Sequence, residues 1–173
     1  MSFSFDIKHA ETGSLARVGT INTPHGAIQT PAFIPVGTTA LRALESLYWS
    51  GVWLIEKRPI ENGVLVLPKE FAYEERSHIP SVQDALDAVL QFLKQENRNY
   101  WVAETELLIM PGYPLHFCDG IITNFHQPKS TLLVLIAALI GEDWERVYDT
   151  ALANDYRFLS YGDSSILYKK QDI

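Results

Sequence analysis

Three groups of polar residues in this sequence have types and spacings that suit a binding or catalytic site. The first comprises Gly37, Thr38 and Thr39 with Arg42 and Glu45; the second comprises Asn124, Phe125 and His126 with Lys129, Ser130 and Thr131; the third runs from Ser160 to Ser165 and includes Tyr161, Gly162 and Asp163. His126 precedes Gln127-Pro128 in a loop, and histidine is the usual proton-transfer group near neutral pH. Acid–base chemistry at His126 is therefore one interpretation, and an incidental loop histidine is the other.

The first group also has a purely structural interpretation. Thr38 or Thr39 can cap a helix that begins there. Arg42 and Glu45 are three residues apart on one face of that helix, which suits a surface salt bridge. Gly37-Thr38-Thr39 lacks the glycine spacing and the lysine of a phosphate-binding P-loop. Capping and a surface ion pair therefore remain the alternatives to a ligand site.

Structural alternatives exist for the other two groups as well. Ser130 or Thr131 can cap the apolar helix that follows over 132–140 and ends at Gly141. The segment 160–165 can be a tight turn, because Gly162-Asp163 is good turn material. We expect Ser130 and Thr131 to act as caps, and Asn124, His126 and Lys129 to face a ligand site beside the buried helix.

The elements that must position these groups alternate between strands and helices. We expect strands over 16–21 and 27–35, a helix over 38–56, a strand over 63–67, a helix over 82–97 capped by Ser81, strands over 105–113 and 119–125, helices over 132–140 and 143–155, and a strand, a turn and a second strand over 156–170. This order predicts an α/β protein: a layered α/β/α sandwich with a mixed sheet, preceded by an N-terminal β-hairpin. Ligands bind outside the carboxyl ends of strands in such sheets. If their strands are parallel neighbours, the three groups meet in one crevice.

Composition narrows the class of protein. The chain has 173 residues, of which 47% are hydrophobic, and a net charge of −7, which weakly disfavours a large nucleic-acid footprint. Its single cysteine, Cys118, excludes an internal disulfide, and no histidine or cysteine spacing suits a metal. The apolar run 132–140 is too short to span a membrane, and the N-terminus lacks a secretory signal. We therefore expect a soluble, cytoplasmic protein without a metal or a membrane partner.

Three motifs, taken together, closely resemble one family. They are VGTTALRALES (36–46), MPGYPLHFCDGIITNFHQPKSTLLVLIAALIG (110–141) and YRFLSYGDSSIL (156–167), and in this order they resemble the C-terminal part of S-adenosylmethionine:tRNA ribosyltransferase-isomerase. The resemblance covers about residues 36–170. It implies transfer and rearrangement of the ribosyl part of S-adenosylmethionine onto 7-aminomethyl-7-deazaguanine at the tRNA wobble position, which gives epoxyqueuosine. It also implies an α/β/α fold into which a β-barrel is inserted.

The start of the chain differs from that family. Residues 16–38, ARVGTINTPHGAIQTPAFIPVGT, resemble the N-terminus of tRNA-guanine transglycosylase, but the later aspartate motifs and zinc cysteines of that enzyme are missing. We expect a hairpin segment over 1–37, an α/β domain over 38–173 and no inserted barrel. An incomplete ribosyltransferase-isomerase is the first interpretation. The alternatives are a non-catalytic S-adenosylmethionine- or tRNA-binding remnant and transglycosylase-like base exchange.

The resemblance also implies roles for single residues. His126 is expected to transfer protons, with Asp163 orienting it, binding ribose hydroxyls or acting as the base. Tyr161 and Tyr156 are expected to lie against the sulfonium by cation–π contact, and Phe125 to receive the modified base. The expected substrate-binding residues are Thr38 and Thr39 for the methionine carboxylate, Arg42, Lys129 and Arg157 for carboxylate or tRNA phosphates, and Glu45, Asn124, Ser130, Thr131, Ser160 and Gly162 elsewhere in the crevice.

Overall fold

The structure is a computed structural model that describes residues 4–10, 12, 17–23, 26–30, 32–60, 63–127 and 129–169. The chain forms two compact units, residues 1–34 and 35–173, and each is described here by itself. The boundary after residue 37 that the sequence suggested stays a prediction. Within the described ranges, no helix combines the length and the hydrophobicity needed to cross a lipid bilayer.

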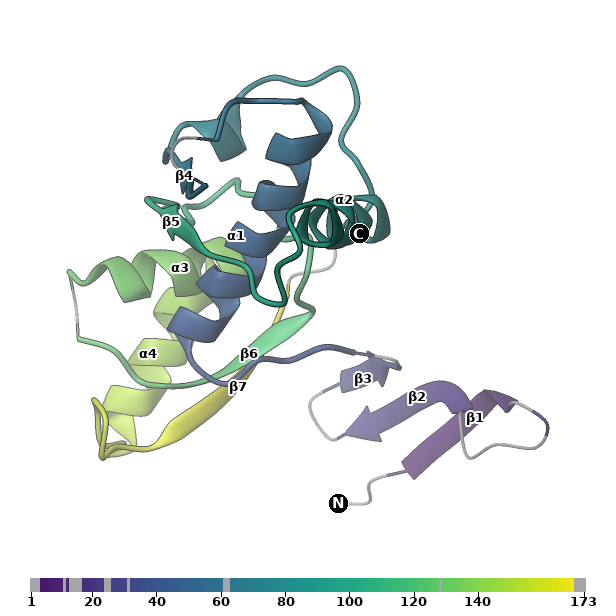
Figure 1. The fold of residues 1–173 in the computed structure, drawn as a ribbon. Helices are drawn as coiled ribbons and strands as arrows, with labels where there is room; N and C mark the ends of the chain where they lie inside the picture. Colours follow the sequence, from purple (N-terminus) through teal and green to yellow (C-terminus); the bar gives the residue numbers. More distant parts are fainter. Residues whose placement is uncertain are drawn as a thin grey trace. The chain divides into compact units, whose positions relative to one another are not determined.

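The first unit contains a three-stranded antiparallel sheet. Its strands are β1 (Ser4–Ala10), β2 (Arg17–Thr23) and β3 (Gly26–Gln29), and they pair in the order β1-β2-β3 (Figure 1). Thr23 pairs with Gly26, so the hairpin predicted around this turn is confirmed. Gly19 in β2 approaches β1 so closely that a Cβ there would lie 2.3 Å from the carbonyl oxygen of Asp6. A side chain at this position would therefore push the two strands apart.

The second unit mixes helices with two small sheets. Its elements are α1 (Thr38–Ile55), β4 (Leu65–Leu67), the 3-10 helix η1 (Phe71–Tyr73), α2 (Val82–Gln95), β5 (Ala103–Thr105), β6 (Gly120–Asn124), α3 (Thr131–Ile140), α4 (Asp143–Ala153) and β7 (Ser164–Tyr168). β4 pairs with β5 in parallel, and β6 pairs with β7 antiparallel. A single parallel bridge joins Val36 to Ile122. The α/β class is confirmed, and its strands are divided between small sheets instead of forming one broad layer.

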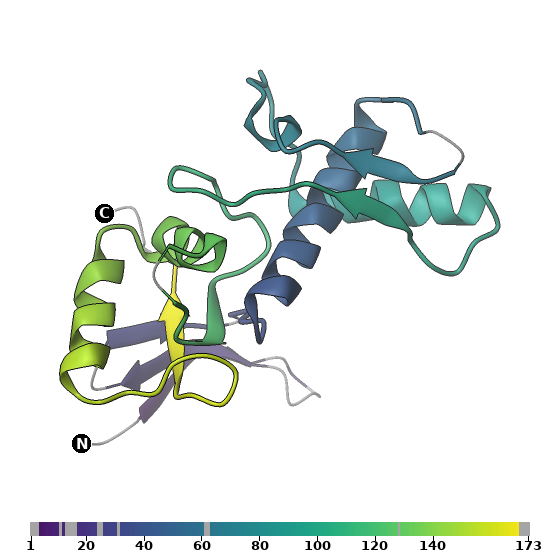
Figure 2. The same ribbon diagram turned by 90° about the vertical axis from the view of Figure 1, so that its left-hand side faces the viewer.

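The long helix α1 connects the two sheets of this unit. Figure 2 shows β4, β5 and α2 beside its C-terminal half, and β6 near its N-terminus. Leu41, Tyr48 and Val52 are fully buried along one face of α1 because they recur with helical spacing. At the crossing with α2, a Cβ on Gly51 would lie 2.1 Å from the carbonyl oxygen of Ala85. Glycine at this position therefore permits the close approach of the two helices.

Serine caps begin α2 and α3, and a glycine ends α3, at the positions that the sequence predicted. The Ser81 side chain accepts a hydrogen bond from the Asp84 backbone at 3.1 Å and caps α2. The Ser130 side chain accepts one from the Leu133 backbone at 3.4 Å and caps α3, which ends at Gly141 with a φ of 63°. The prediction of a threonine cap on α1 is wrong, because its N-cap is Gly37 with a φ of 88°. No side chain caps α1.

Several predicted strands are absent or shortened. The strand expected over 27–35 ends at Gln29 as β3. The strand expected over 105–113 ends at Thr105, although the turn at Pro111-Gly112 is present. The strand expected at the start of 156–170 does not form, because Asp155 (φ 55°) and Leu159 (φ 70°) have left-handed backbone conformations. A strand needs extended φ values at each position. The segment after α4 is therefore an irregular turn that leads into β7.

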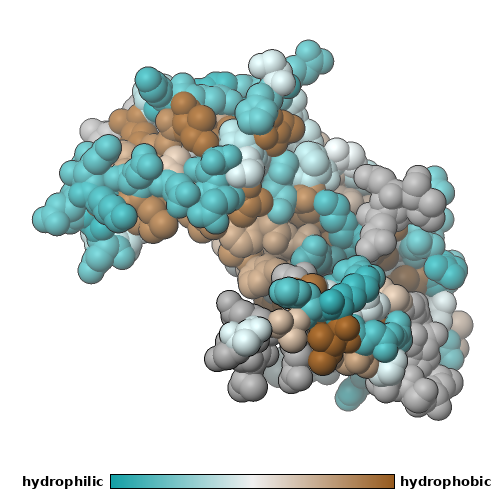
Figure 3. All heavy atoms as spheres, turned by 90° about the vertical axis from the view of Figure 1, so that its right-hand side faces the viewer, coloured by the Kyte–Doolittle hydropathy of each residue, from teal (hydrophilic) through white to brown (hydrophobic). Residues whose placement is uncertain are grey.

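Large apolar side chains at the surface are scattered. Leu90, Leu152 and Ile166 are 52%, 62% and 58% exposed. On the face that Figure 3 draws, hydrophobic residues in brown are interspersed with hydrophilic residues in teal. Single exposed apolar residues are common on proteins. They do not by themselves indicate a site.

Glu45 is fully buried on α1 and anchors a loop to it. Its carboxylate accepts hydrogen bonds from the Tyr113 hydroxyl at 2.8 Å and from the Phe117 and His116 backbone N–H groups at 2.8 Å and 3.1 Å. The Trp49 indole N–H donates to the same Tyr113 oxygen at 2.6 Å. The predicted surface salt bridge between Arg42 and Glu45 is therefore wrong, because Glu45 points into the core.

Burial raises the pKa of Glu45 above its ordinary value of 4.5, although the hydrogen bonds from Phe117, His116 and Tyr113 oppose this shift. The folded state thus holds the proton to higher pH than the unfolded chain does. The stability that Glu45 contributes is complete below about pH 4.5 and is lost as pH rises through the folded-state pKa. We expect Glu45→Gln, which cannot ionise, to gain stability relative to wild type as pH rises, by at most about 1.4 kcal/mol per pH unit.

Urea unfolding of both proteins between about pH 5 and about pH 8 measures this difference. The exposed Glu104→Gln is the matched control for loss of one carboxylate. A difference between wild type and Glu45→Gln that does not change with pH would contradict the prediction.

Candidate functional site

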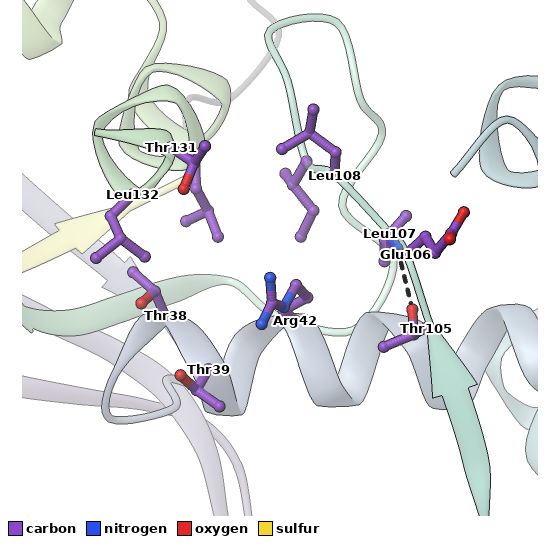
Figure 4. A pocket seen from close by; sticks show the side chains of 11 residues that line it. Thr38, Thr39, Arg42, Thr105, Glu106, Leu107, Leu108, Thr131 and Leu132 are labelled. Carbon is purple, nitrogen blue, oxygen red and sulfur yellow. Dashed lines mark hydrogen bonds between the residues drawn. The ribbon is translucent and has the colours of Figure 1, made fainter. Parts of the chain in front are cut away.

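A cavity of about 180 Å³ lies where the N-termini of α1 and α3 meet the loop after β5. Its lining residues come from three segments: Thr38, Thr39 and Arg42 from α1; Thr105 to Ile109 from the end of β5 and the loop after it; and Thr131, Leu132 and Leu135 from α3. Figure 4 shows the Arg42 side chain rising from α1 between the α3 side of the cavity and the side of Leu108. The cavity lies entirely within the second unit.

Strand pairing explains why two helices begin at this cavity. The Gly37 backbone N–H donates to the Ile122 carbonyl at 2.7 Å, and the Ile122 N–H donates to the Pro35 carbonyl at 2.9 Å. The bridge is parallel, so the chain leaves both segments in the same direction, into α1 and into the loop before α3. Helix N-termini carry N–H groups without intrahelical partners and a partial positive charge. This end of the unit therefore favours an anionic group.

The cavity combines charges with an apolar wall. Arg42 is exposed, and among the residues that the structure describes it forms no ion pair. Glu106 contributes a carboxylate, while Leu107 and Ile109, each 2% exposed, contribute an apolar surface. An elongated ligand with a charged end and an aliphatic chain matches this lining. The sequence pattern did not indicate a site at 105–109, because its apolar residues are equally typical of a strand.

The second and third groups of polar residues meet, but not as expected. β6 and β7 are antiparallel, with Asn124 opposite Ser164, so the premise of three parallel strands is wrong for β7. The Asn124 side chain donates to the Leu159 carbonyl and accepts from the Ser164 hydroxyl, both at 2.8 Å. The end of β6 and the turn before β7 are therefore joined by hydrogen bonds. Thr131 is the member of the second group that lines the cavity.

His126 lies in the loop between β6 and α3 and is half-buried. Its Nε2 is 3.0 Å from the Thr123 hydroxyl, and its backbone N–H donates to the Tyr148 hydroxyl at 3.1 Å. Burial lowers the pKa of His126 below 6.5, so the imidazole is neutral near pH 7 and can accept a proton. His126 does not line the cavity. Lys129, in the same loop, is exposed and has a φ of 64°.

Asp163 and Gly162 stabilise the turn before β7. The Asp163 carboxylate accepts from the Arg157 backbone N–H at 2.7 Å and lies 3.4 Å from the Arg157 guanidinium. The backbone hydrogen bond is the main reason that the pKa of Asp163 lies below its usual value. A Cβ on Gly162 would be 2.3 Å from the Arg157 carbonyl oxygen, so only glycine fits there without movement. These contacts give both residues a structural role.

The aromatic residues of the third group differ sharply in exposure. Tyr161 is 96% exposed and Tyr156 is 45% exposed, while Phe125 is 5% exposed. The Phe125 ring contacts those of Tyr148, Tyr156 and Phe158, each at 5.5 Å between centroids. The prediction that Phe125 receives a base is therefore wrong, because this ring belongs to the core. Ser160, beside Tyr161, is exposed.

Metal ligands do not cluster in the part of the chain that the structure describes. No three or more histidine, cysteine or acidic side chains come together there in an arrangement that could hold a metal ion. Cys118 is buried in the core.

Comparison with known proteins identifies the chain's relatives. The family model described as queuosine biosynthesis protein matches residues 17–167. The S-adenosylmethionine:tRNA ribosyltransferase-isomerase of Cereibacter sphaeroides is 34% identical over 160 residues, which cover 92% of this chain and 33% of that protein. The enzyme of the same name from Jannaschia sp. is 53% identical over 68 residues, covering 39% of this chain and 19% of that protein. The chain thus spans a third or less of the length of these relatives.

A solved structure is also similar. The crystal structure of S-adenosylmethionine tRNA ribosyltransferase from Thermotoga maritima is 26% identical, with a TM-score of 0.37, over 74% of this chain and 37% of that one. The family match begins at residue 17 and so includes most of the segment 16–38, which resembles tRNA-guanine transglycosylase. The transglycosylase resemblance stays an observation on the sequence alone.

The turn before β7 can be tested through Gly162. We expect Gly162→Ala to reduce the free energy of unfolding by about 1–3 kcal/mol, because its Cβ would overlap the Arg157 carbonyl. Ser160→Ala, at an exposed position in the same turn, is the control and should change stability by less than about 0.5 kcal/mol. Thermal or urea unfolding measures both variants. Equal stabilities of the two variants would show that the turn tolerates a side chain at 162.

Proposed function

We propose a function from the premise that this chain belongs to the queuosine biosynthesis protein family: it takes part in the transfer of the ribosyl part of S-adenosylmethionine to tRNA. The cavity at Arg42 is the observation that carries this proposal. The acceptor would be 7-aminomethyl-7-deazaguanine at the wobble position, the product would be epoxyqueuosine, and the reaction would take place in the cytoplasm. S-adenosylmethionine is then a co-substrate.

The cavity suits the amino-acid end of S-adenosylmethionine. The carboxylate of that end would lie near Arg42 and the N-termini of α1 and α3, and its cationic groups near Glu106. The apolar wall of Leu107 and Ile109 would contact the methylene chain. A volume of about 180 Å³ is below the roughly 300–1,000 Å³ of typical ligand pockets, so the ribose and adenine would extend beyond it.

The reaction requires proton transfers. A base removes a proton from the carbon beside the sulfonium, which the positive charge acidifies. Adenine then takes up a proton and leaves the sugar. The neutral aminomethyl group of the tRNA nucleobase attacks, and methionine departs. His126 is the residue that we propose as the base, because burial keeps its imidazole neutral. Asp163 is a positioning residue for the turn in this proposal.

A second candidate is a protein that binds S-adenosylmethionine or tRNA without catalysis. His126, the residue proposed as the base, does not line the cavity at Arg42, and this observation favours such a role. Binding without chemistry would then be the activity of the second unit.

Release of adenine separates the two candidates. We expect wild-type protein to release adenine from S-adenosylmethionine only in the presence of tRNA that carries 7-aminomethyl-7-deazaguanine, as measured by chromatography of the reaction mixture. The matched control is the same tRNA with guanine at the wobble position. Binding of S-adenosylmethionine without adenine release in either sample would favour the non-catalytic candidate.

Arg42 tests the cavity directly. We expect Arg42→Ala to weaken S-adenosylmethionine binding by about tenfold to a hundredfold, since a charge-assisted hydrogen bond contributes about 1.5–3 kcal/mol. Isothermal titration calorimetry measures the affinity. Arg146→Ala is the control that removes an equal charge elsewhere, because the Arg146 side chain is 79% exposed on α4. Equal affinities of Arg42→Ala and Arg146→Ala would place the ligand outside this cavity.

The pH dependence of adenine release tests the proposal that His126 is the general base. Burial lowers the pKa of His126 below 6.5, so the rate of adenine release should fall as pH decreases through this lowered pKa and the imidazole takes up a proton. We expect His126→Gln to lower that rate by about a hundredfold or more and to remove this acid limb. The control is His78→Gln, at an exposed position. An unchanged pH profile in His126→Gln would remove His126 from the reaction.

A further inference from the structure

Tyr161 projects from the turn between α4 and β7 and is 96% exposed. We infer that its ring is a stacking contact for an unpaired base of the tRNA, an inference that rests on the proposed function. Tyrosine and tryptophan rings provide large contact areas at a low cost in conformational entropy, because few side-chain torsions have to be fixed. Bases outside a helix stack on such rings in many RNA-binding proteins.

The turn that carries Tyr161 is held at both of its ends. The Gly162 N–H donates to the Leu159 carbonyl at 2.9 Å, which closes a turn with Ser160 and Tyr161 at its corners. The Asp163 N–H donates to the Arg157 carbonyl at 2.8 Å, while the Asp163 carboxylate accepts from the Arg157 N–H at 2.7 Å. The backbone that carries Tyr161 is therefore fixed, so only its side-chain torsions have to be ordered when a ligand binds.

The core of the unit anchors the same turn. The Leu159 N–H donates to the carbonyl of the buried Phe125 at 2.9 Å, and the Asn124 side chain donates to the Leu159 carbonyl at 2.8 Å. Leu159 has a φ of 70°, a conformation that is unfavourable for a residue with a side chain. These contacts hold the strained conformation in place. A strained turn that places an aromatic ring in water is a feature of binding surfaces more than of packing.

The chemistry around the ring favours a base over a phosphate. Leu159 is 49% exposed beside it, and the Arg157 guanidinium is 3.4 Å from the Asp163 carboxylate, so the two charges of this turn offset each other. Ser160, also exposed, adds a neutral hydroxyl. This part of the surface is thus aromatic and without net charge. Such a surface matches the face of a heteroaromatic ring.

Two heteroaromatic ligands share this chemistry: a tRNA base and the adenine of S-adenosylmethionine. Small ligands are enclosed over roughly 70–90% of their surface in their pockets. Tyr161 has almost no protein around its side chain and does not line the cavity at Arg42. A ring with one open face can contribute to binding only if other contacts hold the ligand. A polymer such as tRNA meets this condition.

Affinity for tRNA tests the inference. Fluorescence anisotropy would measure the binding of labelled tRNA carrying 7-aminomethyl-7-deazaguanine to the full chain at several salt concentrations. We expect Tyr161→Ala to weaken binding by about fivefold to a hundredfold, and Tyr161→Phe, which retains the ring, to bind within about twofold of wild type. Tyr100→Ala, at a tyrosine that is 64% exposed elsewhere in the unit, is the control and should match wild type.

Salt dependence separates stacking from charge. Loss of a phosphate contact lowers the slope of affinity against salt concentration, whereas loss of a stacked ring lowers affinity with the slope unchanged. We expect the unchanged slope for Tyr161→Ala. Tyr161→Ala that binds tRNA as tightly as wild type overturns the inference.

The other outcomes show which partner contacts the Tyr161 ring, and they separate failure of this inference from failure of the proposed function. Weaker S-adenosylmethionine binding by Tyr161→Ala, with tRNA binding intact, would assign the ring to adenine and overturn the inference. Dissociation of a self-associated species in Tyr161→Ala, with tRNA binding intact, would assign it to a protein contact. If wild type binds tRNA and S-adenosylmethionine but Tyr161→Ala is normal, only this inference fails. If wild type binds no tRNA, the proposed function fails with it.

Discussion

Two backbone hydrogen bonds at Ile122 determine where the candidate site forms. They join the segment before α1 to β6 in parallel, at 2.7 Å to Gly37 and 2.9 Å to Pro35. Because both segments then leave in the same direction, α1 and α3 begin on the same side, and residues from both helix N-termini line one cavity. Gly37 suits this position because its φ of 88° allows a strand to lead directly into a helix without a capping side chain.

A buried carboxylate in the N-terminal half of α1 supports the same cavity. Glu45 accepts hydrogen bonds from Tyr113 and from the backbone of 116 and 117, which fixes the loop between β5 and β6 against α1. That loop begins with residues 106–109, which form the apolar wall of the cavity. A charged group in the core is unfavourable unless its hydrogen-bonding capacity is met, and here backbone N–H groups and a hydroxyl meet it. The cavity therefore depends on a residue that does not line it.

The site and the turn of Tyr161 belong to one structural unit but differ in character. The cavity is small and combines Arg42 with leucine side chains, which suits one end of a small ligand. The turn is exposed and has no net charge, which suits contact with one face of a larger ligand. β6 connects them, because it ends at Asn124, whose side chain bonds to the turn, and the chain then continues to α3. The ribosyl transfer that we propose, between a small donor and a polymeric acceptor, would use two such surfaces.

The sequence by itself determined the local elements and the family. Periodic apolar residues predicted α1, α2 and α4, and Ser81, Ser130 and Gly141 marked helix ends, because capping depends on neighbours along the chain. Leu41 and Tyr48 lie on the buried face of α1, and Glu45 lies on the same face. The helical spacing of these three residues therefore indicates that Glu45 is buried.

Only the tertiary structure decided which faces and strand ends meet. The antiparallel direction of β7, the irregular segment 106–109 and the outward position of Tyr161 all depend on contacts between residues far apart in the chain. Strand propensity is the same for either pairing direction, and an apolar run is the same whether it forms a strand or a wall. Long-range hydrogen bonds at Ile122, Glu45 and Asn124 select one arrangement among those that the local sequence allows.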